Sequence, residues 1–323
     1  MEQITPQEMP YADEIEFKQG FIERYKQLTD YNKFRQASLT FLRRSIRVNT
    51  LKISVAKLKR QLEKDWILQP IPWCDEGFWI EHRGEEKRRD VGNLKQHALG
   101  YFYLQEAASM IPPVILQPKP GEEVLDMCAS PGSKSTQMAA MMQNKGLLIS
   151  NDYQGDRLKP LSLNIQRMGI LNCVITLMDG VRFRKTNQMF DKILLDAPCS
   201  GTGTICKSLK TIKIWNPNMI TKLARTQKQL IEAAFKILKP GGTLVYSTCS
   251  VEPEENEGVV SHLLSNYHNA QTMPIDIGLN RGPAINEFGK ETYHEGVRNS
   301  LRLWPQDNNT EGFFVSKIVK SDK

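Results

Sequence analysis

Between residues 123 and 248, apolar runs with the character of β-strands alternate with segments of helical character. The strand-like runs are EVLDMC, LLISND, CVITLMD, KILLDAP and GTLVYSTC. Helical character is found in STQMAAMMQ, in DRLKPLSLNIQRMG and over residues 221–238. Continuously apolar strands separated by helices are typical of a mostly parallel sheet that is covered on both faces. The alternation therefore predicts an α/β fold for the larger part of the chain.

The residues before this region predict a smaller unit. Apolar residues recur at helical spacing from Phe17 to Phe41, which indicates a helical segment. The runs SIRVNTL, VAKLKRQLEKD, WILQPIPW and GFWIEH indicate the order strand, helix, strand, strand, in a small α/β module that ends near residue 95. YFYLQEAASMIPPVIL is expected to form a helix before a linker at LQPKPG. We therefore expect an N-terminal domain over residues 1–100 and a second domain over residues 101–323.

The composition excludes several classes of protein. With 323 residues and 40% hydrophobic content, the chain can bury a sizeable core. No apolar run approaches the roughly 20 residues of a membrane helix, and the acidic, polar start is unlike a signal peptide. The six cysteines form no CxxC pair, which argues against a zinc site or a disulfide framework. We predict a cytoplasmic protein with free thiols, no membrane contact and no bound metal.

The net charge of +7 favours an anionic partner, with an ordinary solvated surface as the alternative. The distribution of the charge favours nucleic acid, because residues 33–64 hold ten basic residues and a single acid, Glu63. We predict that this segment forms a phosphate-contacting face. The ten basic residues are Lys33, Arg35, Arg43, Arg44, Arg47, Lys52, Lys57, Lys59, Arg60 and Lys64.

The run EVLDMCASPGSKS places Gly132 and several small residues between a strand and a helix. Backbone N–H groups at such a helix N-terminus can approach a ligand closely, which predicts a nucleotide-like cofactor. The run matches neither GxGxxG nor the GxxxxGK[ST] phosphate loop, so dinucleotide and ATP binding are weakly supported. A purely structural turn is the alternative.

Two further carboxylates follow strands. Asp152 lies 26 residues beyond Asp126, where a sheet of this type offers a carboxylate to ribose hydroxyls, and a helix N-cap is the alternative. Asp179 ends CVITLMD and is a candidate for the adenine amino group. For Asp179 the alternative is an ordinary turn residue.

Two cysteines lie just beyond apolar strands. Cys199 comes three residues after Asp196 in ILLDAPCSGTG, and Cys249 follows the strand in YSTCSVEPEEN. Because ligands of such sheets bind outside the carboxyl ends of the strands, we expect both thiols and the carboxylates to line one crevice. Inert burial is the alternative for each cysteine.

The motifs RVNTLK, DMCASPGSK, DAPCSG, YSTCS and EGFFVSKI together resemble the RNA cytosine C5-methyltransferases of the Nop2/Sun (RsmB) type, with the archaeal tRNA enzymes the most similar. The match covers most of the chain and includes two cysteines fifty residues apart. It implies a Rossmann-like methyltransferase sheet that depends on S-adenosylmethionine, preceded by a small RNA-recognition-like α/β domain. One departure is Gln306 after Pro305, where the family commonly has a Pro-His pair.

By position, the resemblance implies that Cys249 is the nucleophile and that Cys199 assists release of the methylated RNA. A thiol suits this chemistry, because cytosine C5 takes a methyl group only after C6 is attacked, and a thiolate can later leave. DNA cytosine methyltransferases carry their nucleophile in a Pro-Cys motif, which makes Cys199 the rival candidate. Lys134 is a catalytic candidate that would order the catalytic pocket, with an exposed loop cation as the alternative. Asp196 is a catalytic candidate for contact with the cytosine edge as well as with the cofactor.

The resemblance also implies a set of residues that hold S-adenosylmethionine. These residues are Cys128, Ala129, Ser130, Pro131, Gly132, Ser133, Lys134, Asp152, Arg157, Asp179 and Asp196.

We interpret the chain as an RNA (cytosine-5)-methyltransferase that acts on tRNA, with rRNA as the alternative. Two rivals are an enzyme of the same fold acting on protein or a small molecule, and a non-catalytic RNA-binding or ribosome-assembly protein. The pair Cys199 and Cys249 argues against both, because neither function needs two thiols there. Phe78 and Trp79 are candidates for stacking on bases, although core packing is favoured.

Overall fold

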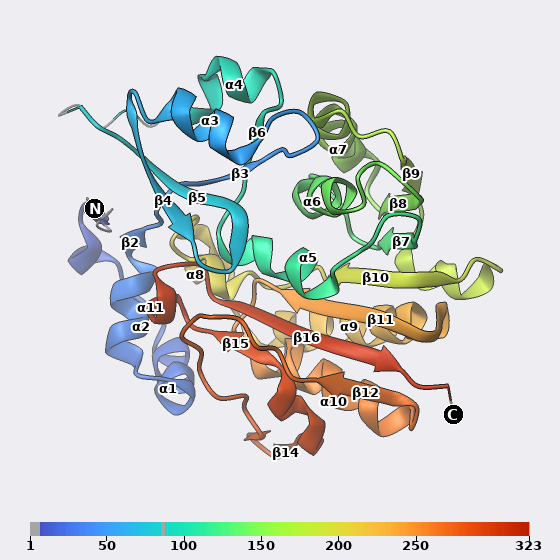
Figure 1. Ribbon diagram of the computed structural model, residues 1–323. Helices are drawn as coiled ribbons and strands as arrows, with labels where there is room; N and C mark the ends of the chain where they lie inside the picture. Colours follow the sequence, from blue (N-terminus) through green and yellow to red (C-terminus); the bar gives the residue numbers. More distant parts are fainter. Residues whose placement is uncertain (1–6, 85–87, 89, 323) are drawn as a thin grey trace.

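The computed structural model describes residues 7–84, 88 and 90–322. Figure 1 shows a large sheet, a smaller sheet formed by earlier residues, and a pair of N-terminal helices, α1 and α2. Within the described ranges, no helix combines the length and the apolar character needed to cross a membrane.

The large sheet has eight strands. Five of them are parallel and lie in the order β11 (Leu238–Thr248), β10 (Phe190–Asp196), β7 (Glu123–Asp126), β8 (Leu147–Asp152) and β9 (Cys173–Leu177). β16 (Phe313–Lys320) pairs antiparallel with β11, and both β12 (Ala270–Met273) and β15 (Leu301–Leu303) pair with β16. The predicted mostly parallel α/β sheet is confirmed.

Helices cover both faces of this sheet because neighbouring strand residues point to opposite sides. In β10, Leu194 packs in one hydrophobic cluster, whereas Ile193 and Leu195 pack in another. The first cluster contains residues of α5 (Ile111–Leu116), α6 (Ser133–Met141) and α7 (Gly155–Met168). The second contains residues of α9 (Pro217–Lys236) and α10 (Glu257–Asn266).

The smaller sheet is antiparallel, with the strand order β4-β5-β3-β6. Its strands are β3 (Ser45–Val48), β4 (Trp66–Ile71), β5 (Cys74–His82) and β6 (Phe102–Leu104), and α3 (Val55–Leu62) connects β3 to β4. Leu58 and Leu62 of α3 pack on the sheet in a separate cluster. This connectivity is that of the split β-α-β fold, so the expected RNA-recognition-like architecture is confirmed.

The helix expected over YFYLQEAASMIPPVIL was wrong for its first half, where β6 forms instead. Phe102 packs in the cluster beneath α3, and Tyr103 packs in the cluster of α5 and α6 on the other side. Aromatic neighbours that are buried on opposite sides fit a strand and not a helix. Because β6 pairs with β3, the smaller sheet contains residues on both sides of the boundary expected between residues 100 and 101.

The single N-terminal helical segment expected from Phe17 to Phe41 is two helices, α1 (Gln19–Leu28) and α2 (Tyr31–Ser38). They are separate because the Asp30 side chain accepts hydrogen bonds from the backbone N–H groups of Asn32 and Lys33, and so begins a new helix. Their aromatic residues pack against Trp215, Val251 and Trp304 of the larger domain.

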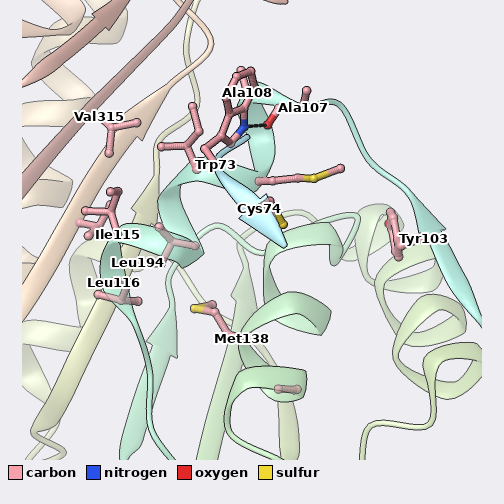
Figure 2. Packing of buried hydrophobic residues seen from close by; sticks show 14 of the residues in the cluster. Trp73, Cys74, Tyr103, Ala107, Ala108, Ile115, Leu116, Met138, Leu194 and Val315 are labelled. Carbon is pink, nitrogen blue, oxygen red and sulfur yellow. Dashed lines mark hydrogen bonds between the residues drawn. The ribbon is translucent and has the colours of Figure 1, made fainter. Parts of the chain in front are cut away.

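The smaller and the larger sheet share one hydrophobic cluster (Figure 2). Trp73, Trp79 and Tyr103 of the smaller sheet region pack with Met138 of α6. The Trp73 indole N–H also donates to the Ala107 carbonyl at 2.8 Å. Phe78 and Trp79 are each 5% exposed, so the expected core packing of these two rings is confirmed.

The other regular elements are short. They are β1 (Gln7–Glu8), β2 (Thr40–Phe41), β13 (Glu287–Phe288), β14 (Glu291–Thr292), α4 (Lys95–Ala98), α8 (Lys210–Ile214) and α11 (Pro305–Asn308).

Candidate active site

The residues singled out in the sequence lie along the carboxyl edge of the parallel strands. β7 ends at Asp126, β8 at Asp152 and β10 at Asp196. Thr248 ends β11 directly before Cys249, and Asp179 follows the end of β9 by two residues. These five strands are neighbours in the sheet, so the fold brings all the expected positions to one edge.

The loop between β7 and α6 is held tightly against the next strand. The Ala129 N–H donates to the Asn151 carbonyl at 2.7 Å, and the Ser130 N–H donates to the Asp152 carboxylate at 3.3 Å. Gly132 has φ +100°, and a Cβ there would lie 2.9 Å from a Leu161 methyl group. A glycine is therefore required at the turn into α6.

Arg157 braces the same loop from α7. Its guanidinium donates to the Ser130 carbonyl at 2.8 Å and lies 3.5 Å from the Asp152 carboxylate. Asp152 is buried, and it also accepts from the Gln154 N–H at 3.1 Å. Asp179 is exposed, and its carboxylate accepts a hydrogen bond from the Val181 N–H at 3.0 Å. This contact is typical of an ordinary turn residue, which was the alternative for Asp179.

Asp126 is a buried carboxyl group with an unused oxygen. Its Oδ2 accepts from the Ser135 hydroxyl at 2.6 Å, whereas its Oδ1 has no hydrogen-bond partner among the described residues. Burial raises the pKa of Asp126 to about 7, although the Ser135 hydrogen bond opposes that rise. Nearby charges on Asp196 and Asp152 add to it. This concentration of carboxyl groups and the unused oxygen fit a cationic ligand with N–H donors, such as the methionine part of S-adenosylmethionine.

Lys134 and Asp196 form a largely buried ion pair. The Lys134 Nζ lies 2.7 Å from Asp196 Oδ2, and the Ser247 hydroxyl donates to Asp196 Oδ1 at 2.7 Å. Burial disfavours the ammonium form of Lys134, but the charge and hydrogen bond of Asp196 outweigh this effect and raise the pKa of Lys134. Asp196 is thus fixed from both sides, and its carboxylate retains lone pairs for a further donor.

The two cysteines expected at the site face one another. Their sulfur atoms are 3.3 Å apart, and neither cysteine is in a disulfide. The hydrogen bond between Cys199 and Cys249 raises the pKa of Cys199 well above its usual value, and burial and the charges of Cys249 and Glu255 act in the same direction. Cys199 is therefore held as a neutral thiol. Burial likewise raises the pKa of the Cys128 thiol, in the loop between β7 and α6.

A buried polar network fixes the two cysteine-bearing loops, and the sequence did not single it out. The Glu255 carboxylate accepts from the Ser200 N–H at 2.9 Å, from the Ser250 hydroxyl at 2.9 Å and from the Gln227 amide at 2.8 Å. Glu255 lies in YSTCSVEPEEN, but the acidic run gives no sign of which carboxylate turns inward.

Gly203 provides a second link between these loops. Its N–H donates to the Cys249 carbonyl at 3.0 Å, and its carbonyl accepts from the Gly312 N–H at 2.9 Å. A Cβ at Gly203 would lie 2.2 Å from the Gly312 carbonyl oxygen and 2.8 Å from that of Cys249. Three backbone segments thus meet at a point where no side chain fits.

The prediction that Arg47 belongs to a phosphate-contacting face was wrong. It is 2% exposed, because its guanidinium lies between the smaller sheet and α6. It donates to the Ser133 carbonyl at 2.8 Å and to the Thr136 hydroxyl at 2.9 Å, and it also contacts Gln105. Its role is to join β3 to the helix that carries Lys134.

The departure at Gln306 has a local explanation. The Gln306 side-chain amide donates to the Thr29 hydroxyl at 3.0 Å, which ties α11 to the turn between α1 and α2. Among the described residues, no group of three His, Cys, Asp or Glu side chains is arranged to hold a metal ion.

Known proteins match this chain over most of its length. It is 44% identical over 316 residues to a tRNA (cytosine(49)-C(5))-methyltransferase of Pyrococcus abyssi. This alignment covers 97% of this chain and 99% of the Pyrococcus protein. It is 46% identical to a ribosomal RNA small subunit methyltransferase F of Shewanella oneidensis over 87% of this chain. The match spans only 58% of the length of the Shewanella protein.

Solved structures give the same result. A methyltransferase homologue from Pyrococcus horikoshii superposes with a TM-score of 0.81 at 38% identity, over 94% of this chain and 95% of that one. NSun6 from Pyrococcus horikoshii, solved with SFG, an S-adenosylmethionine analogue, gives a TM-score of 0.83 at 26% identity, over 95% and 99% of the two chains.

The fold and the edge residues define an S-adenosylmethionine-dependent methyltransferase. Residues 113–319 match the family described as 16S rRNA methyltransferase RsmB/F, and residues 17–107 match the N-terminal domain of 16S rRNA methyltransferase RsmF. The chain therefore belongs to the RsmB/F family of RNA cytosine C5-methyltransferases, which confirms the resemblance drawn from the motifs.

Proposed function

We propose that this chain methylates C5 of a cytidine in tRNA, with Cys249 as the nucleophile and Cys199 as the residue that assists release. The observation that carries the assignment of the two cysteines is the 3.3 Å contact between their sulfur atoms. The raised pKa of Cys199 supports the choice, because a neutral thiol is a hydrogen-bond donor and a poor nucleophile. Cys199 thus suits the role of assisting release better than the role of nucleophile.

The reaction follows from the residues at this edge. The Cys249 thiolate forms a bond to C6 of a cytosine that has been unstacked, and the electron pair of the C5–C6 double bond moves to C5. S-adenosylmethionine, when bound, supplies the electrophilic methyl group that C5 takes. Loss of the C5 proton to a base then restores the double bond and breaks the bond between Cys249 and C6. The Cys199 S–H, beside the departing sulfur, stabilises the thiolate as it leaves.

Lys134 and Asp196 are proposed to orient the base. A carboxylate is a natural acceptor for the exocyclic amino group of cytosine. Asp196 is held by Lys134 and Ser247 on its two oxygens, so it meets the base in a fixed orientation. For the cofactor, we propose the loop Cys128–Lys134 together with Asp152, Arg157, Asp179 and Asp196.

The choice of tRNA is supported by the extent of the similarity along this chain. The tRNA enzyme of Pyrococcus abyssi aligns with 97% of this chain at 44% identity, whereas the Shewanella rRNA enzyme aligns with 87% at 46% identity. The rRNA substrate is the alternative. Three further points stay predictions. They are the division into domains at residue 100, an RNA-binding role for the N-terminal domain, and a cytoplasmic location.

The test is methyl transfer from labelled S-adenosylmethionine to total tRNA and to rRNA, followed by nucleoside analysis. We expect wild type to form 5-methylcytidine on tRNA, and we expect Cys249→Ala to lose at least about a thousandfold in rate, as removal of a nucleophile does. Cys199→Ala should accumulate a covalent RNA adduct that survives denaturing electrophoresis, because addition still occurs and release fails.

The outcomes separate the parts of the proposal. An adduct in Cys249→Ala and none in Cys199→Ala would exchange the two roles. 5-Methylcytidine on rRNA alone would replace the tRNA assignment. The absence of 5-methylcytidine on both RNAs would refute the proposed activity.

A further inference from the structure

Glu255 is a buried carboxylate for which no ion pair is found among the described residues. Its side chain is fully buried in the short turn Pro253–Glu255, a few residues after Cys249. The nearest buried acids in the sequence, Glu252 and Glu257, are each paired with an arginine. A buried charge without a counter-ion is costly, and such a group beside reactive side chains is a candidate for function.

Three donors hold Glu255 in its charged form. The Ser200 N–H and the Gln227 amide both donate to Oε2, and the Ser250 hydroxyl donates to Oε1. The Ser250 hydroxyl oxygen itself accepts from the Glu252 N–H at 3.1 Å, which leaves its hydrogen available for Glu255. Burial raises the pKa of Glu255, but these hydrogen bonds oppose the rise because they stabilise the carboxylate.

The same contacts fix the backbone next to both cysteines. Ser200 and Ser250, which donate to Glu255, each directly follow one of the two cysteines. Gln227 also donates to the carbonyl of Pro198, directly before the first cysteine, at 2.9 Å. One carboxylate thus links the segments that bring the two sulfur atoms to 3.3 Å.

The negative charge of Glu255 also acts on the Cys199 thiol. The hydrogen bond with Cys249, burial and the charge of Cys249 raise the pKa of Cys199, and the charge of Glu255 adds to the rise. A thiol that stabilises the departing Cys249 sulfur by donating a hydrogen bond is useful only while it keeps its proton. The charge of Glu255 therefore extends the pH range over which Cys199 can act.

Other titratable groups lie near the two cysteines. Tyr246 of β11 donates to the Glu255 backbone carbonyl, and burial raises the pKa of Tyr246 well above its usual value. Burial disfavours the ammonium forms of Lys134 and Lys207, but nearby carboxylates and the charge of Cys249 outweigh this effect. The remaining groups at the ends of these strands are Asp126, Cys128 and Asp196. All of them are common to the variants compared below, so their effects cancel in the comparison.

We propose that Glu255 is a positioning residue for the methyl-transfer reaction, which holds Cys199 against Cys249 and keeps the Cys199 thiol protonated during release. The inference rests on the proposed function, which gives Cys199 the release role. Glu255 acts through the two cysteine-bearing loops, so its two effects, the hydrogen bonds and the charge, can be tested separately.

Glu255→Gln removes the charge and keeps the hydrogen bonds. The amide oxygen can accept from the Ser200 N–H and from Gln227, and the amide nitrogen can donate to the Ser250 hydroxyl oxygen. The Ser250 hydrogen can then turn to the Thr202 hydroxyl, 3.2 Å away. Glu255→Asp makes the opposite change, because it keeps the charge but is one methylene too short to reach all three donors.

The first experiment measures the Cys199 thiol directly, in protein without RNA. Alkylation of Cys199 by iodoacetamide is followed by mass spectrometry between about pH 7 and pH 10. Glu255→Gln should shift this profile to lower pH, so that the rate at a fixed alkaline pH rises several-fold, whereas Glu255→Asp should keep the wild-type profile. Glu252→Gln is the matched control, because it removes a buried carboxylate that accepts from Tyr25 and Trp215 instead. Coincident profiles for Glu255→Gln and wild type would overturn the proposal.

The second experiment follows methyl transfer to RNA over the same pH range. In Glu255→Gln the covalent RNA adduct should accumulate at alkaline pH, where wild type still releases its product, while KM for the RNA stays unchanged. Glu255→Asp should lose several-fold in kcat at every pH, and a wild-type kcat in this variant would also overturn the proposal. A wild type that forms no 5-methylcytidine would refute the proposed function, whereas an unshifted alkylation profile refutes the role of Glu255, so the two failures are distinguishable.

Discussion

At the scale of single residues, the site depends on which carboxyl and thiol groups are charged. The sequence predicted that Asp126, Asp196, Cys199 and Cys249 lie at the ends of strands. This was possible because an apolar strand is recognisable in the sequence and ends where its run of apolar residues stops. The charge state of each group depends on neighbours distant in sequence. Cys199, for example, is governed by Cys249, fifty residues later. This coupling is set by the packing of β10 against β11, which the motifs could not specify.

Asp126 predicts a pH dependence of stability. Its pKa is about 7 in the folded protein and near 3.8 when unfolded, so the folded state keeps its proton over this interval while the unfolded state loses it. The free energy of unfolding should therefore fall as the pH rises from about 4 to about 7. Asp126→Asn should flatten this fall, in thermal melts of the protein without cofactor between pH 5 and 8.

Two comparisons sharpen this measurement. Glu311→Gln should also reduce the slope, because the pKa of Glu311 is likewise raised to about 7. Asp179→Asn serves as the control at an exposed carboxylate. Parallel Tm profiles for wild type and Asp126→Asn would show that Asp126 is ionised in the folded state and would refute the argument.

At the scale of elements, the loops after β10 and β11 act as one unit with the start of β16. Gly203 joins the Cys249 and Gly312 backbones, and the network of Glu255 fixes the residues on either side. Gly203 is visible in the motif DAPCSGTG, but a glycine is needed there because of a contact with Gly312, directly before β16 and more than one hundred residues later. A glycine can occur in a loop for many reasons, so the motif alone could not indicate the contact with Gly312.

Gly203→Ala should disable the site more than it destabilises the fold. The new methyl group would meet two carbonyl oxygens within 3 Å, and relief requires the Cys249 loop to shift. We expect a loss of at least tenfold in kcat for methyl transfer and a lower Tm. Gly278→Ala is the control, because no atom lies within 4 Å of a Cβ at that position. A wild-type kcat in Gly203→Ala would show that the added methyl group fits without a shift of the Cys249 loop.

At the scale of the whole molecule, the smaller and larger sheets are joined by a common core and by Arg47. The sequence predicted both sheets, since each has its own strand and helix order. It did not predict that the α1–α2 pair would pack on the larger domain, because aromatic residues at helical spacing do not indicate which surface they cover. Arg47 was misassigned for a similar reason, since a cluster of basic residues says nothing about which one turns inward.

The shared core predicts that the two sheets unfold together. Trp73 and Trp79 report on the smaller sheet, and they pack in the same cluster as Met138 of α6. In a Trp215→Phe, Trp304→Phe variant, which removes the tryptophans of the larger domain, urea titrations followed by tryptophan fluorescence and by far-ultraviolet circular dichroism should therefore give one coincident transition. Two separated midpoints would mean that the smaller sheet is an independent domain. Arg60→Ala, on the exposed face of α3, should leave the coincidence intact.

The backbone contact between Gly203 and Gly312 also has a consequence for synthesis on the ribosome. The Cys249 loop cannot be linked through Gly203 to Gly312 until residue 312 has emerged, although both cysteines and the loop between β7 and α6 are made earlier. At roughly 5–20 residues per second, synthesis from residue 249 to residue 312 takes roughly 3–13 seconds. During that time the nascent chain carries Cys249, the proposed nucleophile, without the contact that fixes its loop, so methylation competence should begin only after the start of β16 is translated.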